Sequence, residues 1–558
     1  MATTYFSPGV YVQEVPSAVQ PIAGVGTSTA GFIGVIPDEI IIPTSPVQFK
    51  SQKITKQSNQ KDYDLATFPV NDASGTFEVR VGQKVLEDAL LTNVKDGGKK
   101  FTKAQVVLKD DPEADFTVNY IGLFNQVTNE LIGKVEQKKE VSSLPLKNYP
   151  VNEAVGTYSI LVDGKSIPNE TKVTLKNDEP NERAKVIFEP ALKLPDATTT
   201  PQTITLNYQV FFPTFKVAPT KEVKLCTNFN EFKKFFGDFS SNPQQNQLAH
   251  AVYGFFNNGG TRCYVTRVKT QDEISVDALE VFEAIDEIAI VVAPGVTDKA
   301  ARSAIVTHCQ QKTGDRFAIF DCQETDTASS FNEENDNKPD NSNYAAFYFP
   351  WIQVFDPATK AMNPNGNGLI YVPPSGHIAG IYARVDTQRG VHKAPANEVV
   401  FGALGVKQLI SKNQQDGLNP KGINCIRDLN GNIRVWGART IGGDDNGEFK
   451  YINVRRLFLF LRESIDEGTQ WTVFEPNTPD LWARIRRSVT AFLTNVWRSG
   501  ALFGSTPEQA FYVKCDEENN PPEVRDAGQV MIEIGVAVVK PAEFVIFRLS
   551  QWAGPGSK

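Results

Sequence analysis

The sequence has few of the residues that most often carry catalytic or metal-binding chemistry. Its 558 residues include four histidines, three methionines and six cysteines. The cysteines stand singly, and no Cys-x-x-Cys pair occurs. This spacing predicts reduced, mostly buried thiols, and it argues against both a disulfide framework and a zinc site.

Two further absences narrow the class of protein. No apolar run reaches the roughly 20 residues needed to span a bilayer, and the first residues have neither the basic nor the apolar region of a signal peptide. We therefore expect assembly in a cytoplasm and no membrane insertion. The formal net charge of -8 argues against a general nucleic-acid binder, because neutralising phosphates needs clustered lysine and arginine.

The candidate catalytic residues do not form a convincing constellation. Ser375 and His377 stand two apart in the stretch PPSGH, where no carboxylate partner is evident, so we interpret the stretch as a turn. His308 and Cys309 are adjacent on a predicted helix, where neighbouring side chains diverge by about 100° and do not share a metal easily. The acidic run 443–447 lacks the alternating ligands of a calcium loop and is interpreted as a hairpin turn. We predict no catalytic residue, no metal and no cofactor.

The length and apolar content predict several folded domains. A chain of 558 residues with 41% hydrophobic residues exceeds what one core normally supports, so we expect three or more. Apolar runs at 288–292 and 317–320 flank a helical pattern over 297–311, which predicts a β-α-β unit with a parallel sheet buried on both faces. Gly295 follows the first run, but no GxGxxG or Gly-Lys-Ser pattern accompanies it, so a nucleotide-dependent enzyme is disfavoured.

An internal repeat precedes this unit. Residues 68–84 (FPVNDASGTFEVRVGQK) align without gaps onto 149–165 (YPVNEAVGTYSILVDGK), an offset of 81 residues. Shorter matches relate 103–109 to 183–189 and 116–120 to 204–208. Short alternating runs broken by glycine, asparagine, aspartate and proline predict two tandem β-sandwich modules of about 80 residues each. One larger β domain with internal symmetry is the alternative.

Each end of the chain has a β-prone segment that is apolar on both faces. The first contains Val10, Tyr11, Val12 and Val15, and the second contains Phe544, Val545, Ile546 and Phe547. Prolines and glycines follow the first segment and favour an extended connector over packing into the chain's own core. Exposed strands of this kind aggregate unless they have a dedicated partner, and pairing within the chain's own sheet is one way to provide it.

The clearest helix of the sequence covers 478–499. Thr478 is the expected N-cap, Pro479 suits the first helical position, and Gly500 suits the end. Seven apolar residues lie within an arc of about 120°: Leu481, Trp482, Ile485, Val489, Phe492, Leu493 and Val496. Arg484, Arg487 and Arg498 fall together on the opposite side, which predicts either a charged contact surface or a solvated face.

Seven long stretches occur in a fixed order: YFSPGVYVQEVPSAVQPIAGVGTSTAGFIG (5–34), LAHAVYGFFNNGGTRCYVTRV (248–268), YAAFYFPWIQVFDP (344–357), VPPSGHIAGIYARVDTQRGVHKAPANE (372–398), GINCIRDLNGNIRVWGART (422–440), NVRRLFLFLRESIDEGTQWTVFEPN (453–477) and FYVKCDEENNPPEVRDAGQV (511–530). Together they resemble the sheath subunits of contractile phage tails and related contractile injection systems. Several long motifs in order are far more specific than one short pattern. The resemblance covers roughly 1–36 and 219–551, with about 180 residues inserted between them.

The resemblance implies mixed α/β (α+β) sheath core domains with an inserted pair of tandem all-β sandwich-like modules. The expected divisions are an N-terminal strand-exchange arm with the first strand (1–36), β module 1 (44–140), β module 2 (141–217), an α/β sheath middle domain (218–385), a C-terminal sheath core domain (386–540) and a C-terminal arm strand (541–558). The inserted modules must not block packing of a lattice, so we expect them on its outer surface.

The resemblance also implies a function without catalysis. Sheath subunits form six-fold rings that stack around an inner tube and contract to drive the tube through a target envelope. They add arm strands to a neighbour's sheet, and a helix of the C-terminal domain faces the tube. Expected partners are further copies of this chain, the inner tube protein, baseplate and terminal cap proteins, and paralogous sheath chains. The expected setting is a phage tail or phage-tail-like particle, assembled in the bacterial cytoplasm and able to be released. The alternative is a surface adhesin or glycan-binding protein that uses the tandem β modules.

Overall fold

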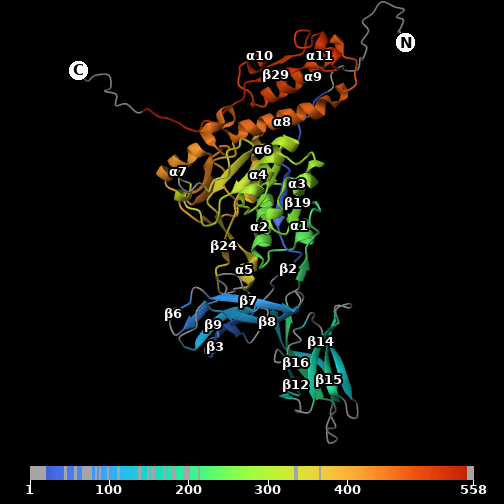
Figure 1. Cartoon of the computed structure of the whole chain (residues 1–558), viewed down its shortest axis with the longest axis vertical. Coiled ribbons are helices and arrows are strands. Elements are labelled where there is room, and N and C mark those ends of the chain that lie inside the picture. Colours follow the sequence, from blue (N-terminus) through green and yellow to red (C-terminus); the bar gives the residue numbers. More distant parts are fainter. Residues whose placement is uncertain are drawn as a thin grey trace, which may run out of the picture.

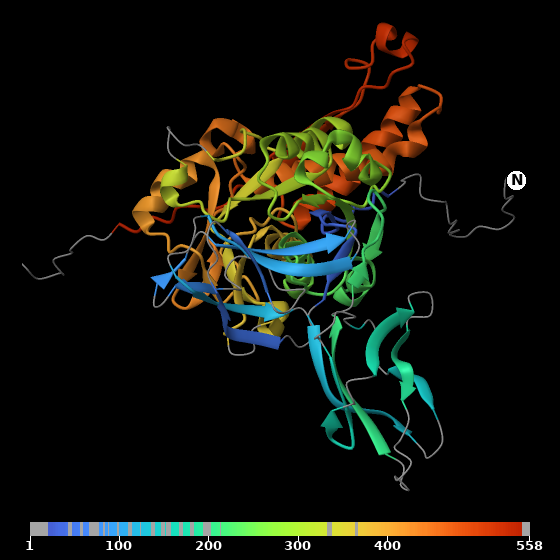
Figure 2. The same cartoon turned by 60° about the horizontal axis from the view of Figure 1, so that its bottom comes forward.

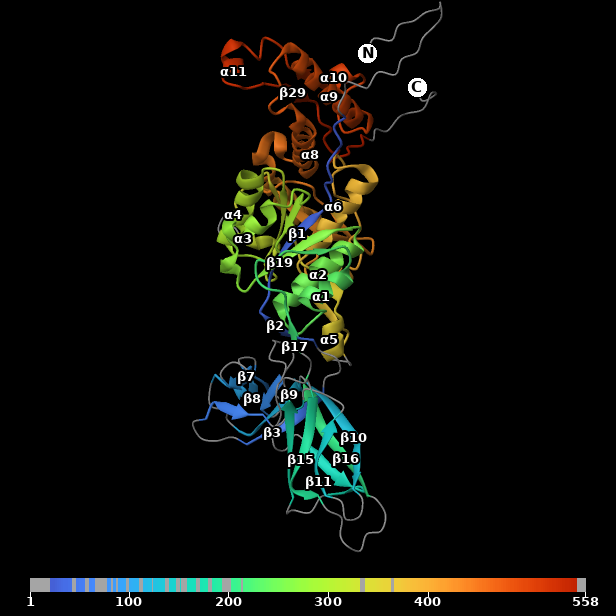
Figure 3. The ribbon, with the colours of Figure 1, turned by 90° about the vertical axis from the view of Figure 1, so that its right-hand side faces the viewer.

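The computed structural model describes residues 21–548 apart from gaps at 43–46, 56–59, 66–77, 82–83, 87–88, 97–99, 110–113, 123, 136–139, 147–150, 152–157, 167–170, 179–182, 193–201, 212–213, 332–336 and 363–365. The described chain is elongated (Figure 1). An α/β body lies in the middle, a group of helices from the C-terminal part lies at one end, and the strands of residues 47–211 lie at the other end (Figure 3).

An eight-stranded sheet forms the centre of the body. Its order is β18-β19-β1-β20-β21-β22-β26-β27. The strands are β1 (Ala30–Val35), β18 (Lys224–Cys226), β19 (Cys263–Val268), β20 (Ile290–Val292), β21 (Phe317–Asp321), β22 (Ala345–Phe349), β26 (Ile423–Leu429) and β27 (Asn432–Val435). The six inner strands run parallel, and β18 and β27 are antiparallel to their neighbours. Strand β1 lies between β19 and β20, so the chain winds first to one side of β1 and then to the other.

Helices cover both faces of this sheet. On one face lie α1 (Phe229–Phe236), α2 (Pro243–Asn257) and α6 (Ser375–Arg389), and on the other lie α3 (Val276–Glu283) and α4 (Lys299–Thr307). Successive residues of β1 point to opposite faces: Phe32 belongs to the first core and Ile33 to the second. The predicted β-α-β unit is confirmed as β20, α4 and β21. Strands β20 and β21 pair in parallel, and Asp298 caps α4 by accepting a hydrogen bond from the Ala301 amide.

Smaller elements complete the body beside the sheet. They are β23 (Ile352–Phe355), α5 (Pro357–Met362), β24 (Leu369–Val372), β25 (Gly405–Val406) and α7 (Lys412–Leu418). The strands β24, β23 and β25 form a separate small sheet.

The C-terminal helices and strands have a core of their own. The elements are α8 (Ile452–Thr469), α9 (Pro479–Arg498), α10 (Pro507–Ala510), β28 (Phe511–Lys514), α11 (Pro522–Asp526) and β29 (Glu533–Val536). Helix α9 confirms the predicted helix. Thr478 accepts a hydrogen bond from the Leu481 amide, and all seven predicted apolar side chains are buried.

Between β1 and β18, the described residues of 47–211 contain strands and no helices. The strands are β3 (Val47–Ile54), β4 (Asp62–Asp64), β5 (Glu78–Val81), β6 (Lys84–Val85), β7 (Leu90–Asp96), β8 (Lys100–Val107), β9 (Phe116–Gly122), β10 (Phe124–Val135), β11 (Val141–Leu146), β12 (Ser159–Val162), β13 (Lys165–Ser166), β14 (Lys172–Asp178), β15 (Arg183–Leu192) and β16 (Gln202–Phe211). They form four sheets: β3-β9-β5-β6 with β4-β8-β7, and β10-β16-β12-β13 with β11-β15-β14.

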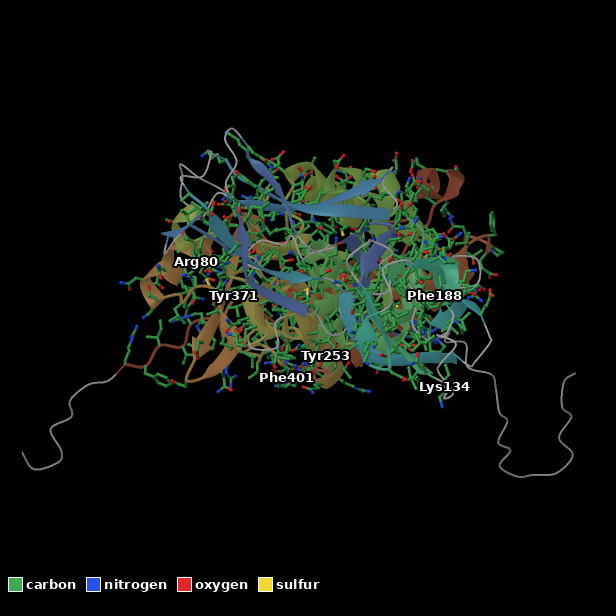
Figure 4. The ribbon with its side chains drawn as sticks, turned by 90° about the horizontal axis from the view of Figure 1, so that it is seen from below. Arg80, Lys134, Phe188, Tyr253, Tyr371 and Phe401 are labelled. Atoms are coloured by element: carbon green, nitrogen blue, oxygen red, sulfur yellow. The ribbon has the colours of Figure 1, made fainter. Side chains whose placement is uncertain are left out.

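These four sheets fall into two groups of the same strand order. Each group has its own cluster of buried apolar residues, around Val106 and Val118 in the first and around Val186 and Leu206 in the second. The second group projects away from the body (Figure 2). Viewed from that end, Arg80 of β5 lies to the left, and Lys134 of β10 and Phe188 of β15 lie to the right (Figure 4).

The boundary between the two groups differs from the expected one at 140/141. Strand β10 covers residues 124–135, and it pairs with β16 rather than with a strand of the first group. The second group therefore begins near Phe124. The expected boundary at 140/141 therefore falls between two strands of one group, β10 and β11.

A two-stranded ribbon joins these sheets to the body. Strand β2 (Glu39–Ile41) pairs antiparallel with β17 (Thr214–Lys216). At its base the buried Arg267 of β19 donates hydrogen bonds to the carbonyls of Ile36 (2.9 Å) and Ala218 and to the Asp38 carboxylate (2.8 Å). The chain thus leaves the sheet at the carboxyl end of β1 and returns beside it, tied by one arginine.

Helices α2 and α6 pack backbone to backbone, which gives a direct test of the body. A Cβ on Gly376 of α6 would lie 2.3 Å from the Ala251 backbone of α2. We expect Gly376→Ala to destabilise the body by about 1–3 kcal/mol through overpacking, measured by thermal or urea unfolding. Gly417 of α7 is the matched control, because a Cβ there meets nothing within 4 Å. Gly417→Ala should be neutral or stabilise by up to about 1 kcal/mol. Equal stability of the two variants would contradict this packing.

Candidate functional site

Ser375 and His377 do not form a catalytic pair. The stretch PPSGH begins helix α6, so its interpretation as a turn was wrong. The Ser375 hydroxyl donates to Oδ2 of the buried Asp321 (2.6 Å), and the Ser375 amide donates to Oδ1 (2.8 Å). His377 instead lies against Gly254 of α2, and burial lowers the pKa of His377 to about 3.

Asp321 is the carboxylate that sequence reasoning missed, because it ends β21, 54 residues before Ser375. The Gly295 amide also donates to Asp321 (3.1 Å), so three loops meet at one carboxylate at the carboxyl edge of the sheet. Burial raises the pKa of Asp321 to about 6, against the opposing effect of the Ser375 and Gly295 hydrogen bonds. Gly295 has φ +70, and a Cβ there would meet the Gln247 side chain. The turn at Gly295 therefore serves to place its amide against the Asp321 carboxylate.

The remaining candidate ligands are also engaged in the fold. His308 and Cys309 are buried in a π-helical turn that follows α4, and Arg316 lies 3.1 Å from Nε2 of His308. The acidic run forms a 3₁₀ segment, Gly443–Phe449, so the expected hairpin turn was wrong. Its Asp444 pairs with Lys450 at 2.6 Å. Within the described ranges, no three histidine, cysteine, aspartate or glutamate side chains are grouped to hold a metal ion.

The C-terminal segment is the most exposed apolar stretch of the described chain. The side chains of Phe544, Val545, Ile546 and Phe547 are between 69% and 84% exposed. No strand is assigned there, and none of the described strands pairs with it. Among the described residues, the alternative of a strand within the chain's own sheet is therefore absent.

A short sheet of the C-terminal domain is open to further strands. Strands β28 and β29 pair antiparallel, from Phe511 opposite Val536 to Lys514 opposite Glu533, and no other described strand joins their sheet. Exposed apolar side chains lie on and beside this sheet: Phe503, Tyr512, Met531 and Ile532. Unpaired edges of this kind are templates for a strand from another chain. Sequence reasoning missed this sheet, whose only local signal is two four-residue strands.

The N-terminal connector is fastened to helix α8. Val10, Tyr11, Val12 and Val15 lie outside the described residues, but the chain from 22 to 27 packs along the helix. Ile22 is buried, the Val25 amide donates to Ser464 Oγ (3.1 Å), and Arg456 donates to the Thr27 carbonyl (2.9 Å). The expectation that the connector avoids the chain's own core was therefore wrong for this part.

One buried ion pair holds the connector in place. Arg456 of α8 pairs with Asp386 of α6 at 2.6 Å, and both side chains are at most 5% exposed. The Thr27 hydroxyl donates to the same Asp386 carboxylate (2.7 Å). The connector, the α/β body and the C-terminal domain thus meet at a single pair of charges.

The three predicted arginines of α9 differ in their surroundings. Arg487 and Arg498 are exposed, and no ion pair is found for them among the described residues. Arg484 is partly covered: it pairs with Glu475 at 2.7 Å and lies over the Trp471 ring. The structure therefore leaves two arginines of this face available to a partner, and the charge of Arg484 is partly balanced within the chain.

Family models match most of the chain beyond residue 272. Residues 273–441 match the phage tail sheath protein central domain, and residues 444–551 match the phage tail sheath C-terminal domain. Among the described residues, no helix combines the length and apolar character needed to cross a membrane.

Curated relatives are tail sheath proteins of phages. The tail sheath protein of Vibrio phage KVP40 is 30% identical over 180 residues, which are 32% of this chain and 26% of the relative. The tail sheath protein of Burkholderia phage BcepMu is 29% identical over 203 residues, which are 35% of this chain and 40% of the relative. The match spans less than half the length of each of these two relatives.

Solved structures match over a larger share. The sheath complex of an extracellular contractile injection system, PVC, in its contracted state has 32% identity and a TM-score of 0.52, covering 60% of this chain and 88% of that chain. A chain of the anti-feeding prophage baseplate has 30% identity and a TM-score of 0.50, with the same coverage. These relatives give the adhesin alternative no support. With two matching domain models and relatives at this identity and coverage, the chain belongs to the phage tail sheath protein family, found in phage tails and tail-like contractile injection systems.

Proposed function

We propose that this chain is the structural subunit of a contractile sheath, which polymerises around an inner tube and contracts to drive the tube through a target envelope. The observation that carries the proposal is an exposed apolar segment, 544–547, in the same molecule as an open two-stranded sheet, β28–β29. In a polymer, the segment of one subunit can extend the sheet of the next. The relatives that form sheath complexes support this reading.

The energies make such a link strong enough for a mechanical lattice. Each ladder hydrogen bond contributes a net of about 0.5–1.5 kcal/mol, and each buried valine or phenylalanine contributes about 1.5–3 kcal/mol. A strand with several of each stabilises a link by several kcal/mol after the cost of ordering it. The segment of Val10, Tyr11, Val12 and Val15 supplies a second strand of the same kind, so every subunit is linked at both ends.

The inserted strands are two tandem β-sandwich-like modules on the outer surface of the lattice. The sequence repeat supports this reading, because equivalent residues pair in both groups: Val79 lies opposite Val118, and Ile160 lies opposite Leu206. Their position also supports it, since both groups lie at the end of the molecule opposite the C-terminal helices (Figure 1). An outward position leaves the lattice contacts of the body unobstructed.

The inner surface of the lattice is then formed by the C-terminal domain. Arg487 and Arg498, with Arg484 beside them, face acidic residues of the inner tube protein. Further partners are copies of this chain in stacked six-fold rings, baseplate and terminal cap proteins, and paralogous sheath chains. Assembly takes place in the bacterial cytoplasm, within a phage tail or tail-like particle. Contraction is a relaxation in which a small free-energy gain per subunit adds up over the linked lattice.

Deleting residues 2–20 tests the link at the N-terminus. We expect a folded chain with nearly unchanged thermal stability, because the described contacts of the connector begin at Ile22. Long polymers should be lost, since the first strand is removed. The measurement is negative-stain electron microscopy of the concentrated chain, in which the wild type should form hollow, striated tubes with outward projections. Normal tubes from the truncated chain would contradict strand linking.

Reversing charge on α9 tests the surface that faces the tube. We expect Arg487→Glu to weaken co-sedimentation with the inner tube protein by about fivefold at low salt, because an attractive pair becomes repulsive. The difference from wild type should shrink as salt rises, since screening weakens exposed pairs. Arg525→Glu, on an exposed residue of α11, is the matched control and should bind normally. Equal binding by both variants would remove α9 from the tube contact.

A further inference from the structure

The chain returns from the C-terminal domain to the α/β body just before the exposed C-terminal segment. There the Glu543 carboxylate accepts four hydrogen bonds. Two come from Arg439, from Nε and Nη2 (both 2.8 Å). The others come from the Tyr451 hydroxyl (2.8 Å) and from Nδ2 of Asn419 (2.7 Å). These donors stand 92 to 124 positions earlier in the chain.

The donors are fixed independently of Glu543. Arg439 is 4% exposed and also donates to the Asn419 carbonyl (3.1 Å) and to the Asp444 carboxylate (3.2 Å). Tyr451 immediately precedes α8, and it forms a β-bridge with Arg439. Two guanidinium donors facing one carboxylate are a rigid and directional pairing. The body therefore carries a built receptor for a single carboxylate.

Glu543 occupies this receptor as an ionised group. Burial by itself raises the pKa of Glu543, but hydrogen bonds from Arg439, Asn419 and Tyr451 outweigh it and hold the pKa below its ordinary value. Burial raises the pKa of the Tyr451 hydroxyl, and its hydrogen bond to Glu543 raises it further, to about 12. Both shifts agree with a charged carboxylate at neutral pH.

The residues directly after Glu543 have the opposite character. Phe544 to Phe547 are exposed and lie outside every described sheet. In Figure 1 the described chain ends on the side of α7, away from the side where the connector enters along α8. Because Glu543 is held in place, the exposed residues that follow it have fewer conformations in the free chain. Less conformational entropy is then lost when this segment binds.

We propose that Glu543 is a positioning residue of the inter-subunit link: its pairing with Arg439, Tyr451 and Asn419 sets the point and direction in which the C-terminal segment leaves the body toward the sheet of a second copy of this chain. The inference rests on the proposed strand link. It adds the residue that sets the direction of the C-terminal segment. It predicts that the link depends on a residue whose four hydrogen bonds all lie within its own subunit.

The test compares Glu543→Gln with Glu523→Gln in polymerisation of the full chain. Glu523→Gln removes the same charge from an exposed site on α11. We expect Glu543→Gln to leave the melting temperature of the monomer within a few degrees and to lower polymer yield by about tenfold, since charge-assisted hydrogen bonds are the strong ones. Tyr451→Phe removes one of the four hydrogen bonds and should give an intermediate loss. The control Glu523→Gln should polymerise like the wild type. A polymer yield equal to wild type for Glu543→Gln as well would overturn the inference.

A second readout follows the segment itself in the monomer. The native cysteines are all buried, so spin labels on Val545→Cys and Glu448→Cys attach selectively. We expect a narrow distance distribution in the parent chain and a broad one with Glu543→Gln. An unchanged distribution would overturn the positioning role even if polymer yield fell. Deleting 544–558 tests the underlying link separately: normal polymers from that deletion would overturn the proposed strand link, and the inference with it.

Discussion

The position of strand β1 in the middle of a parallel sheet determines how the rest of the molecule is laid out. Because β1 lies between β19 and β20, its two ends open at opposite edges of the sheet. The connector enters at the amino end, where Thr27 meets α8 and α6, and the inserted strands leave at the carboxyl end, past Asp38. One buried strand therefore separates the N-terminal connector and the C-terminal helices from the inserted strands by the full length of the body (Figure 3). An insertion of about 180 residues is compatible with the proposed lattice because it leaves from the end opposite the two terminal segments.

Two arginine–carboxylate pairs, one buried and one partly buried, attach both terminal segments to the region of α8. Arg456 with Asp386 holds the connector, and Arg439 with Glu543 holds the C-terminal segment. Such ion pairs add little net stability, because desolvation offsets their attraction, but their geometry is specific. The pairs therefore fix where both segments leave the body, while the apolar residues 544–547 stay exposed. If both terminal segments bind neighbouring subunits as proposed, force on either one would reach α8, since Arg456 lies in this helix and Tyr451 directly precedes it.

Sequence patterns predicted the elements whose signals are periodic and local. Helix α9 and the unit β20-α4-β21 follow from apolar spacing and capping residues, and both are present. Composition misled where tertiary contacts decide: the Pro-Gly stretch at Ser375 starts a helix because Asp321 binds its first turn. The boundary at 140/141 failed because β10 pairs with β16, about 80 residues away, although the repeat offset itself pointed to a second group starting near 125. The hydrogen-bonding site of Glu543 and the sheet β28–β29 could not be predicted from the sequence. Each brings together residues that are far apart in the chain, and no local pattern indicates that they pair.

The carboxyl edge of the sheet shows how a ligand-binding architecture becomes a rigid joint. In doubly wound sheets the crevice beside the reversal of strand order is where ligands usually bind, held by loops that follow the strands. In this chain the same loops bind one another. Asp38, which follows β1, accepts hydrogen bonds from Arg267 and Lys269. Asp321, at the end of β21, accepts hydrogen bonds from the Ser375 hydroxyl and the Gly295 amide. On each side of the reversal, side chains of the chain itself thus make polar contacts with the loops that follow the strands. The edge from which the inserted strands emerge is therefore held by hydrogen bonds and ion pairs within the chain, among them those of Arg267 to the Ile36 carbonyl and to Asp38.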